Sequence, residues 1–120
     1  MTLREKQSKF AVLAAKLILQ AQAMGYQVTL GEALRTPEQA AINARRGTGT
    51  LTSLHISQLA IDLNLFRDGK WLKKSEDHLP LGKWWEGQDP DCRWGGRFKD
   101  HEGKAKPDGN HYSLQHEGRK

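Results

Sequence analysis

The sequence has one cysteine, no long apolar run and no block of like charges, and each absence excludes a class of protein. With Cys92 alone, no disulfide can form within the chain, which fits a protein made in a reducing compartment. No apolar stretch has the length of a transmembrane helix. The net charge of +5 favours an anionic partner, but the basic residues are scattered and do not form the stripe of a nucleic-acid-binding protein.

The first part of the chain predicts an amphipathic helix. Apolar residues from Phe10 to Met24 recur at helical spacing and form one stripe. Thr2 and Glu5 make a capping box at the start, and Gly25 is a natural end. The basic residues and an Ala-Gln-Ala sequence also resemble a cleaved secretion signal. We favour a helix of the folded domain because a lysine interrupts the apolar run.

Later segments alternate in the way that short strands do. From Ala60 to Phe66, aliphatic residues occupy every second position, and Asp62 lies on the opposite face. The Asp-Gly pair at 68–69 predicts a hairpin turn after this strand. A second short alternating run begins at His111.

The length of 120 residues fits one domain over residues 1–120. We expect the α+β class, with helices packed on a short and mainly antiparallel sheet that carries the functional site. The N-terminal helix is expected over about residues 3–24 and the core over about residues 26–115. A further helix is expected after Thr36, because a proline follows at its first position.

Four polar residues could form a metal site if the two predicted strands pair. His55 and His111 offer imidazoles and Asp62 offers a carboxylate, and three protein ligands with an open position are typical of catalytic zinc. Asp108 precedes His111 in a turn that could bring its carboxylate over the site, where it could accept a proton from water. Each spacing is a weak pattern alone, and an isolated Asp62 would more often be a solvated residue of an exposed sheet face.

Arg35 is expected directly before the second helix, where backbone N–H groups also favour anions. A guanidinium there could hold a substrate carboxylate or a developing oxyanion. From residue type alone, an ordinary surface arginine is the simpler interpretation. Cys92 has no feature of a nucleophile and is expected to be packed or half-exposed.

Together these residues resemble the small zinc peptidases of the D-Ala-D-Ala carboxypeptidase and L-alanyl-D-glutamate endopeptidase family. That family includes phage endolysins and shares a metal centre with the Hedgehog signalling domain. Its two main patterns, Ser-x-His-x6-Asp with an alanine two before the Asp and an acidic residue three before a His, are matched by Ser53, His55, Ala60, Asp62, Asp108 and His111. Residues 35–39 and 94–96 resemble two further segments, and the resemblance covers about residues 26–114 in the family's order.

The resemblance implies a zinc-dependent peptidase that acts on bacterial peptidoglycan. One Zn²⁺ ion would be held by His55, Asp62 and His111. Asp108 would carry the proton, Arg35 would assist substrate binding and transition-state charge, and Ser53 would lie beside the ligands or touch the substrate. An aspartate at position 108 favours the L-alanyl-D-glutamate endopeptidases within the family.

Other functions are open at this point. The chain could be a D-alanyl-D-alanine carboxypeptidase of the same family, or a non-catalytic zinc-containing module that only binds the wall. Asp108 argues against the binding module, which needs no proton carrier. A metal-dependent nuclease is suggested by Asn110, His111 and His116, but the scattered charge disfavours nucleic acid as a partner. We expect a monomer without stable membrane association.

One position departs from the family. Gln58 stands where the family usually has glycine, and a glycine there often serves a backbone conformation closed to other residues, so the loop of His55 could be built differently. The remaining histidines, His78, His101 and His116, match no family position and receive no role.

The resemblance also carries an expectation about location. A lysin without a signal peptide would accumulate in the host cytoplasm and would reach the wall with a holin-type, membrane-permeabilising protein. This expectation rests on analogy with the family, and a prophage or bacterial origin fits the sequence as well as a phage origin does.

Overall fold

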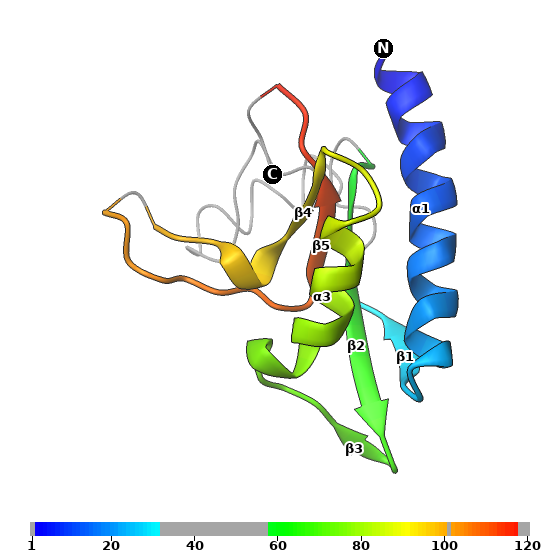
Figure 1. The fold of residues 1–120 in the computed structure, drawn as a ribbon, viewed down its shortest axis with the longest axis vertical. Helices are drawn as coiled ribbons and strands as arrows, with labels where there is room; N and C mark the ends of the chain where they lie inside the picture. Colours follow the sequence, from blue (N-terminus) through cyan, green and yellow to red (C-terminus); the bar gives the residue numbers. More distant parts are fainter. Residues whose placement is uncertain (1, 32–57, 101, 118–120) are drawn as a thin grey trace.

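Helices packed on an antiparallel sheet make up the part of the chain that the computed structural model describes, residues 2–31, 58–100 and 102–117. In chain order the elements are α1 (Leu3–Ala23), β1 (Gln27–Leu30), β2 (Ala60–Arg67), β3 (Lys70–Trp71), the 3-10 helix η1 (Ser75–His78), α3 (Leu79–Glu86), β4 (Cys92–Trp94), the 3-10 helix η2 (Gly95–Arg97) and β5 (His111–Leu114) (Figure 1). The sheet order is β1-β2-β5-β4, and β3 also pairs with β2. The fold is therefore α+β, as predicted.

Helix α1 begins where the sequence predicts. The Thr2 hydroxyl accepts a hydrogen bond from the Glu5 backbone N–H at 3.2 Å, and the Glu5 carboxylate accepts one from the Thr2 N–H at 3.0 Å. This capping box satisfies two backbone donors that the first turn leaves open. No helix among the described residues is both long and apolar enough to span a membrane.

The helices and the buried face of the sheet form the core. The residues of β2 and β5 that point to this face are Ile61, Leu63, Leu65, Tyr112 and Leu114. Trp85 of α3 makes edge-to-face ring contacts with Phe10 of α1 and Tyr112 of β5, at centroid distances of 6.0 and 6.2 Å. Such aromatic pairs stabilise a core beyond the area that they bury. Because side chains alternate along a strand, the opposite face is left to the polar residues of β2 and β5.

Strand β2 is the centre of the sheet. One edge pairs with β1, and the other edge pairs first with β5 and then with β3. The Leu63 N–H donates to Asn110 O at 2.9 Å, and Leu65 O accepts from the Leu72 N–H at 2.8 Å, so β5 and β3 lie along the same edge. Asp68 and Gly69 link β2 to β3 with φ values of 53° and 77°, which are typical of the predicted two-residue hairpin turn.

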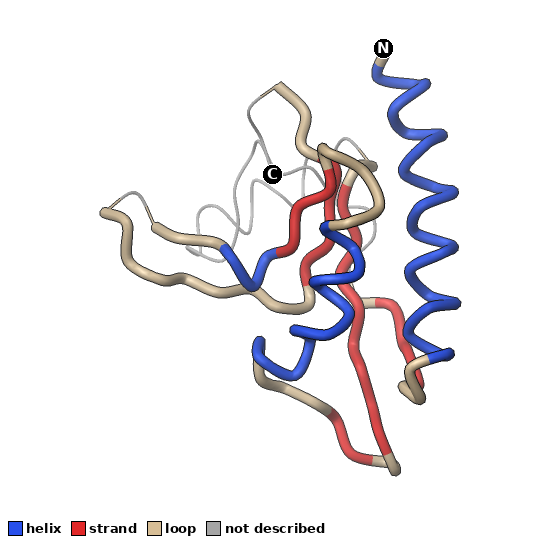
Figure 2. The backbone as a smooth tube through the Cα atoms, viewed as in Figure 1, coloured by secondary structure: helices blue, strands red, loops and turns tan. Residues whose placement is uncertain are grey.

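The chain between η2 and β5 projects away from the sheet before it returns (Figure 2). Its base is closed where the Asp108 N–H donates to Gly95 O at 2.8 Å. Strand β4, which leads into this segment, was not predicted, because the three residues of Cys92–Trp94 are too few to show alternation.

Candidate metal centre

Asp62 and His111 are direct neighbours across the β2–β5 ladder. Side chains at directly opposed positions of an antiparallel pair lie close together on one face. Here that face is the one away from the helices, and His111 Nδ1 lies 3.4 Å from Asp62 Oδ1. His111 is buried and Asp62 is half-buried. The strand register alone therefore brings an imidazole and a carboxylate together.

Asp108 reaches the same place through a tight turn. The His111 N–H donates to Asp108 O at 3.0 Å and closes the turn of residues 108–111. One ligand atom from each of Asp62, Asp108 and His111 lies within 4.8 Å of the other two. The Asp108 side chain is exposed, so this carboxylate faces solvent while the other two groups lie deeper.

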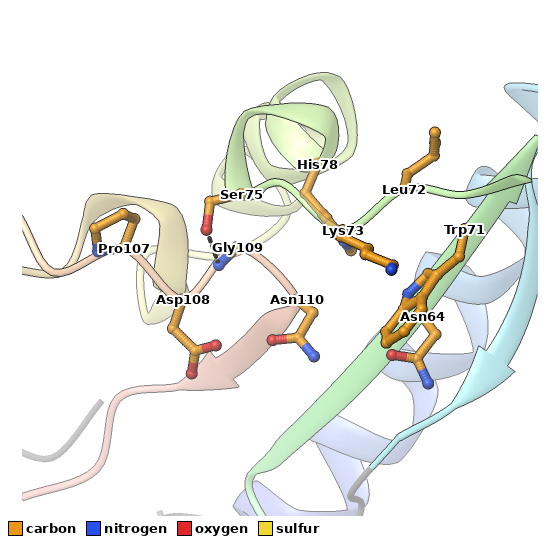
Figure 3. A pocket seen from close by; sticks show the side chains of 10 residues that line it. All are labelled: Asn64, Trp71, Leu72, Lys73, Ser75, His78, Pro107, Asp108, Gly109 and Asn110. Carbon is orange, nitrogen blue, oxygen red and sulfur yellow. Dashed lines mark hydrogen bonds between the residues drawn. The ribbon is translucent and has the colours of Figure 1, made fainter.

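Neighbouring segments hold this turn in place. The Trp94 indole N–H donates to Gly109 O at 2.7 Å, and the Gly109 N–H donates to Ser75 Oγ at 2.9 Å (Figure 3). Gly95 packs directly beneath the turn, because a Cβ atom at this position would lie only 2.0 Å from Asp108 O. Trp94 and Gly95 thus have a physical role, which is to support the backbone that carries Asp108.

The donor set fits a zinc ion. Carboxylate and imidazole groups are both zinc ligands, and two ligands of a tetrahedral zinc at about 2.0–2.2 Å lie roughly 3.3–3.5 Å apart. The separation of 3.4 Å between His111 Nδ1 and Asp62 Oδ1 matches this distance between two ligand atoms. Asp62 and His111 are thus suited to be ligands of one ion, with Asp108 beside them.

Three residues that the sequence singled out, Arg35, Ser53 and His55, lie outside the described residues, and their roles stay predictions. Gln58 is described, and its φ of 57° lies in the left-handed region. This is the conformation that glycine adopts at little cost. The chain therefore keeps a glycine-type backbone at the position where it departs from the family pattern.

A pocket of about 270 Å³ opens beside Asp108 (Figure 3). Its lining residues are Asn64, Trp71, Leu72, Lys73, Ser75, His78, Pro107, Asp108, Gly109 and Asn110. No motif in the sequence assigns a role to Asn64 or Lys73. Asn64 could have been found, because it follows Asp62 by two positions and so shares its face of β2. Lys73 gives no such signal, since it follows the hairpin in an irregular segment.

His78 and Tyr112 form a buried pair beneath the site. His78 Nδ1 lies 2.7 Å from the Tyr112 hydroxyl, and His78 is only 3% exposed. Burial lowers the pKa of His78 from 6.5 to about 4, so the imidazole is neutral at neutral pH. Burial also raises the pKa of the Tyr112 hydroxyl above its ordinary value. The hydrogen bond between these two neutral groups therefore supports β5. It does so directly beside the candidate metal centre, because Tyr112 follows His111 in the chain.

Cys92 does not take part in chemistry at this site. It is 3% exposed on β4, and burial raises the pKa of its thiol to about 12. A thiol rather than a thiolate is present at neutral pH, and the thiol is a weak nucleophile. Of the two environments expected from the sequence, packed or half-exposed, Cys92 has the packed one.

No model of a known protein family matches the chain, and no curated protein matches its sequence. Among solved structures, the crystal structure of the L-Ala D-Glu endopeptidase ChiX from Serratia marcescens is similar, with a TM-score of 0.66 and 20% sequence identity. The match covers 84% of this chain and 77% of that protein. The two proteins therefore share a fold, and it is the fold that the sequence resemblance implied.

Proposed function

We propose that this protein is a zinc-dependent peptidase that hydrolyses the L-alanyl-D-glutamate bond of bacterial peptidoglycan stem peptides. The observation that carries the proposal is the convergence of Asp62, Asp108 and His111 at one place on the sheet. The same fold is found in an L-Ala D-Glu endopeptidase, which supports this substrate class.

In this proposal, zinc would be held by Asp62 and His111 together with His55. The first two have the ligand separation described above. His55 enters from the Ser-x-His-x6-Asp pattern alone. A zinc ion bound there would supply a Lewis acid for the scissile carbonyl and would lower the pKa of a bound water to about 7.

The chain's own residues would then move the proton. Asp108 is an exposed carboxylate close to both ligands, which suits a group that accepts a proton from the attacking water and returns it to the leaving amine. Its turn is fixed at both ends by backbone hydrogen bonds, so the carboxylate needs little reorganisation during the reaction. Arg35 would stabilise the oxyanion or bind a substrate carboxylate, and Ser53 would contact the ligands or the substrate.

The test is mass spectrometry of purified peptidoglycan digested with and without a zinc chelator. Chelator-sensitive products with a new amino end on D-glutamate would establish the proposed activity. Loss of a terminal D-alanine would instead identify a carboxypeptidase. Absence of cleavage by protein shown to carry zinc would leave a non-catalytic wall-binding module.

A further inference from the structure

The pocket beside Asp108 occupies a gap in the sheet. Along one edge of β2, β5 ends its pairing near Leu63 and β3 begins its pairing near Leu65. The side chains of Asn64 and Asn110 stand at this gap and line the pocket together with Asp108 (Figure 3). The pocket is therefore continuous with the candidate metal centre through Asp108 itself.

Amide groups give this pocket hydrogen-bonding capacity. Asn64 and Asn110 are both half-buried. The Asn64 amide donates to Thr29 Oγ1 on β1 at 3.3 Å, which orients its side chain. An amide that is held in this way presents its remaining donor and acceptor in a defined direction.

Lys73 supplies the positive charge. Among the described lining residues, Lys73 and Asp108 are the two that are charged at neutral pH, since His78 is neutral. The Lys73 ammonium lies 5.1 Å from the centroid of the Trp71 ring, and Trp71 stacks on Phe66 of β2. The aromatic stack thus places a cation at the edge of the pocket.

The neighbouring lysine offers a contrast. Lys74 pairs with Glu76 at 4.0 Å, whereas within residues 2–31, 58–100 and 102–117 no carboxylate forms an ion pair with Lys73. Lys74 lines a different, more open depression and does not line the pocket beside Asp108. Among the described residues that line this pocket, Lys73 is therefore the cation available to an anionic group.

We infer that this pocket binds the free α-carboxylate of the D-glutamate residue in the substrate, with Lys73 as the specificity-determining residue. The inference deepens the proposed function and rests on it. Asp108 returns the proton to the leaving amine, so the pocket with Asp108 in its wall receives the residue that bears this amine. In the stem peptide, that residue is D-glutamate, which is linked onward through its γ-carboxyl group. Its α-carboxylate is thus left free, or is an amide in walls that contain D-isoglutamine.

The test compares two peptides, L-Ala–γ-D-Glu–L-Lys and the same peptide with the α-carboxylate converted to an amide. The wild-type protein should cleave the carboxylate form with a kcat/KM roughly tenfold higher, as expected for one charge-assisted hydrogen bond at an exposed site. Lys73→Met keeps most of the side-chain length without the charge and should remove this preference. Lys74→Met is the matched control and should keep it. A preference that is absent in the wild type, or that persists in Lys73→Met, overturns the inference.

A binding measurement separates this inference from the proposed activity. The probe is the product dipeptide γ-D-Glu–L-Lys, in its carboxylate and α-amide forms, titrated into zinc-loaded protein and followed by NMR chemical shifts. Tighter binding of the carboxylate form, lost in Lys73→Met, supports the pocket even where no peptide is cleaved, and then only the proposed activity fails. Cleavage of both peptides at equal rates leaves the activity in place and removes the inference. Equal binding of both forms, or binding of neither, also overturns it.

Discussion

At the scale of single residues, the exposed carboxylate of Asp108 beside two ligand-type side chains leads to the first prediction. Asp108→Asn keeps the size of the side chain and its turn but removes the ability to accept a proton. We expect kcat/KM on peptidoglycan peptides to fall about 10²- to 10⁴-fold, as is usual for the loss of a general acid–base group. Zinc content, measured by elemental analysis of the purified variant, should stay at the wild-type level.

A neighbouring acidic residue provides the control for this variant. Glu102 is exposed on the same segment between η2 and β5 and is not one of the three residues that could hold a metal, so Glu102→Gln removes one negative charge outside the candidate metal group. It should retain wild-type turnover. Loss of zinc from Asp108→Asn would mean that Asp108 is a ligand, and undiminished turnover would remove it from the mechanism.

The left-handed backbone conformation of Gln58 leads to a prediction about the stability of the protein. Its φ of 57° is costly for a residue with a Cβ atom, by roughly 1–2 kcal/mol, while glycine loses up to about 1 kcal/mol more backbone entropy on folding. Gln58→Gly should therefore raise the free energy of unfolding by about 0.5–1 kcal/mol in urea titrations. Ala15→Gly, on the exposed face in the interior of α1, should lower it by about 1 kcal/mol. A destabilised Gln58→Gly variant would show that the Gln58 side chain contributes more than its backbone conformation costs.

At the scale of elements, η2 supports the turn that leads into β5. A Cβ atom on Gly95 would overlap Asp108 O and lie 2.8 Å from His111 Cβ, so Gly95→Ala must displace the turn. Because supporting contacts tune metal sites strongly, we expect zinc affinity to fall about 10- to 100-fold in competition with a chelator. Gly87→Ala, at the end of α3 where the nearest atom lies at 3.5 Å, should bind zinc normally. Equal zinc affinity in both variants would show that the site tolerates movement of the turn.

Elements with a clear periodic pattern could be predicted from the sequence. The helical stripe of α1, the alternation around Asp62 and the Asp-Gly turn are local signals, and each of these elements is present. The meeting of Asp62 with His111 was predicted only on the condition that their strands pair, since nothing local specifies that register. The pairing is present, and it determines the shape of the site.

Features that depend on contacts between distant segments could not be predicted. Strand β4 has three residues and is defined by its pairing with β5. The pocket beside Asp108 combines β2, the segment after β3 and the turn before β5. Lys73, the lysine among its described lining residues, lies in an irregular segment that shows no periodic pattern. The position of the pocket depends on β5 and β3 pairing along the same edge of β2, which is a long-range feature of the fold.

At the scale of the whole molecule, the buried pair of His78 and Tyr112 links the segment around η1 to the central sheet. The pKa of His78 is lowered from 6.5 to about 4 in the folded protein, so between these values the unfolded chain binds more protons than the folded one. The free energy of unfolding therefore rises with pH across this window and falls as the solution is acidified. The stability contributed by neutral His78 is complete above pH 6.5 and is lost as the pH approaches 4.

This linkage gives the last prediction. From pH 7 to pH 5, the titration of His78 should remove about 2 kcal/mol from the free energy of unfolding, at 1.36 kcal/mol for each unit crossed below 6.5. In His78→Asn, which does not titrate, this part of the loss should be absent, although the variant is less stable at pH 7. Urea unfolding at both pH values, with chelator present so that zinc binding does not contribute, measures the difference. Equal losses of unfolding free energy in the two proteins would mean that His78 binds its proton in the folded state as readily as in the unfolded chain. The hydrogen bond to Tyr112 would then not be one between neutral groups.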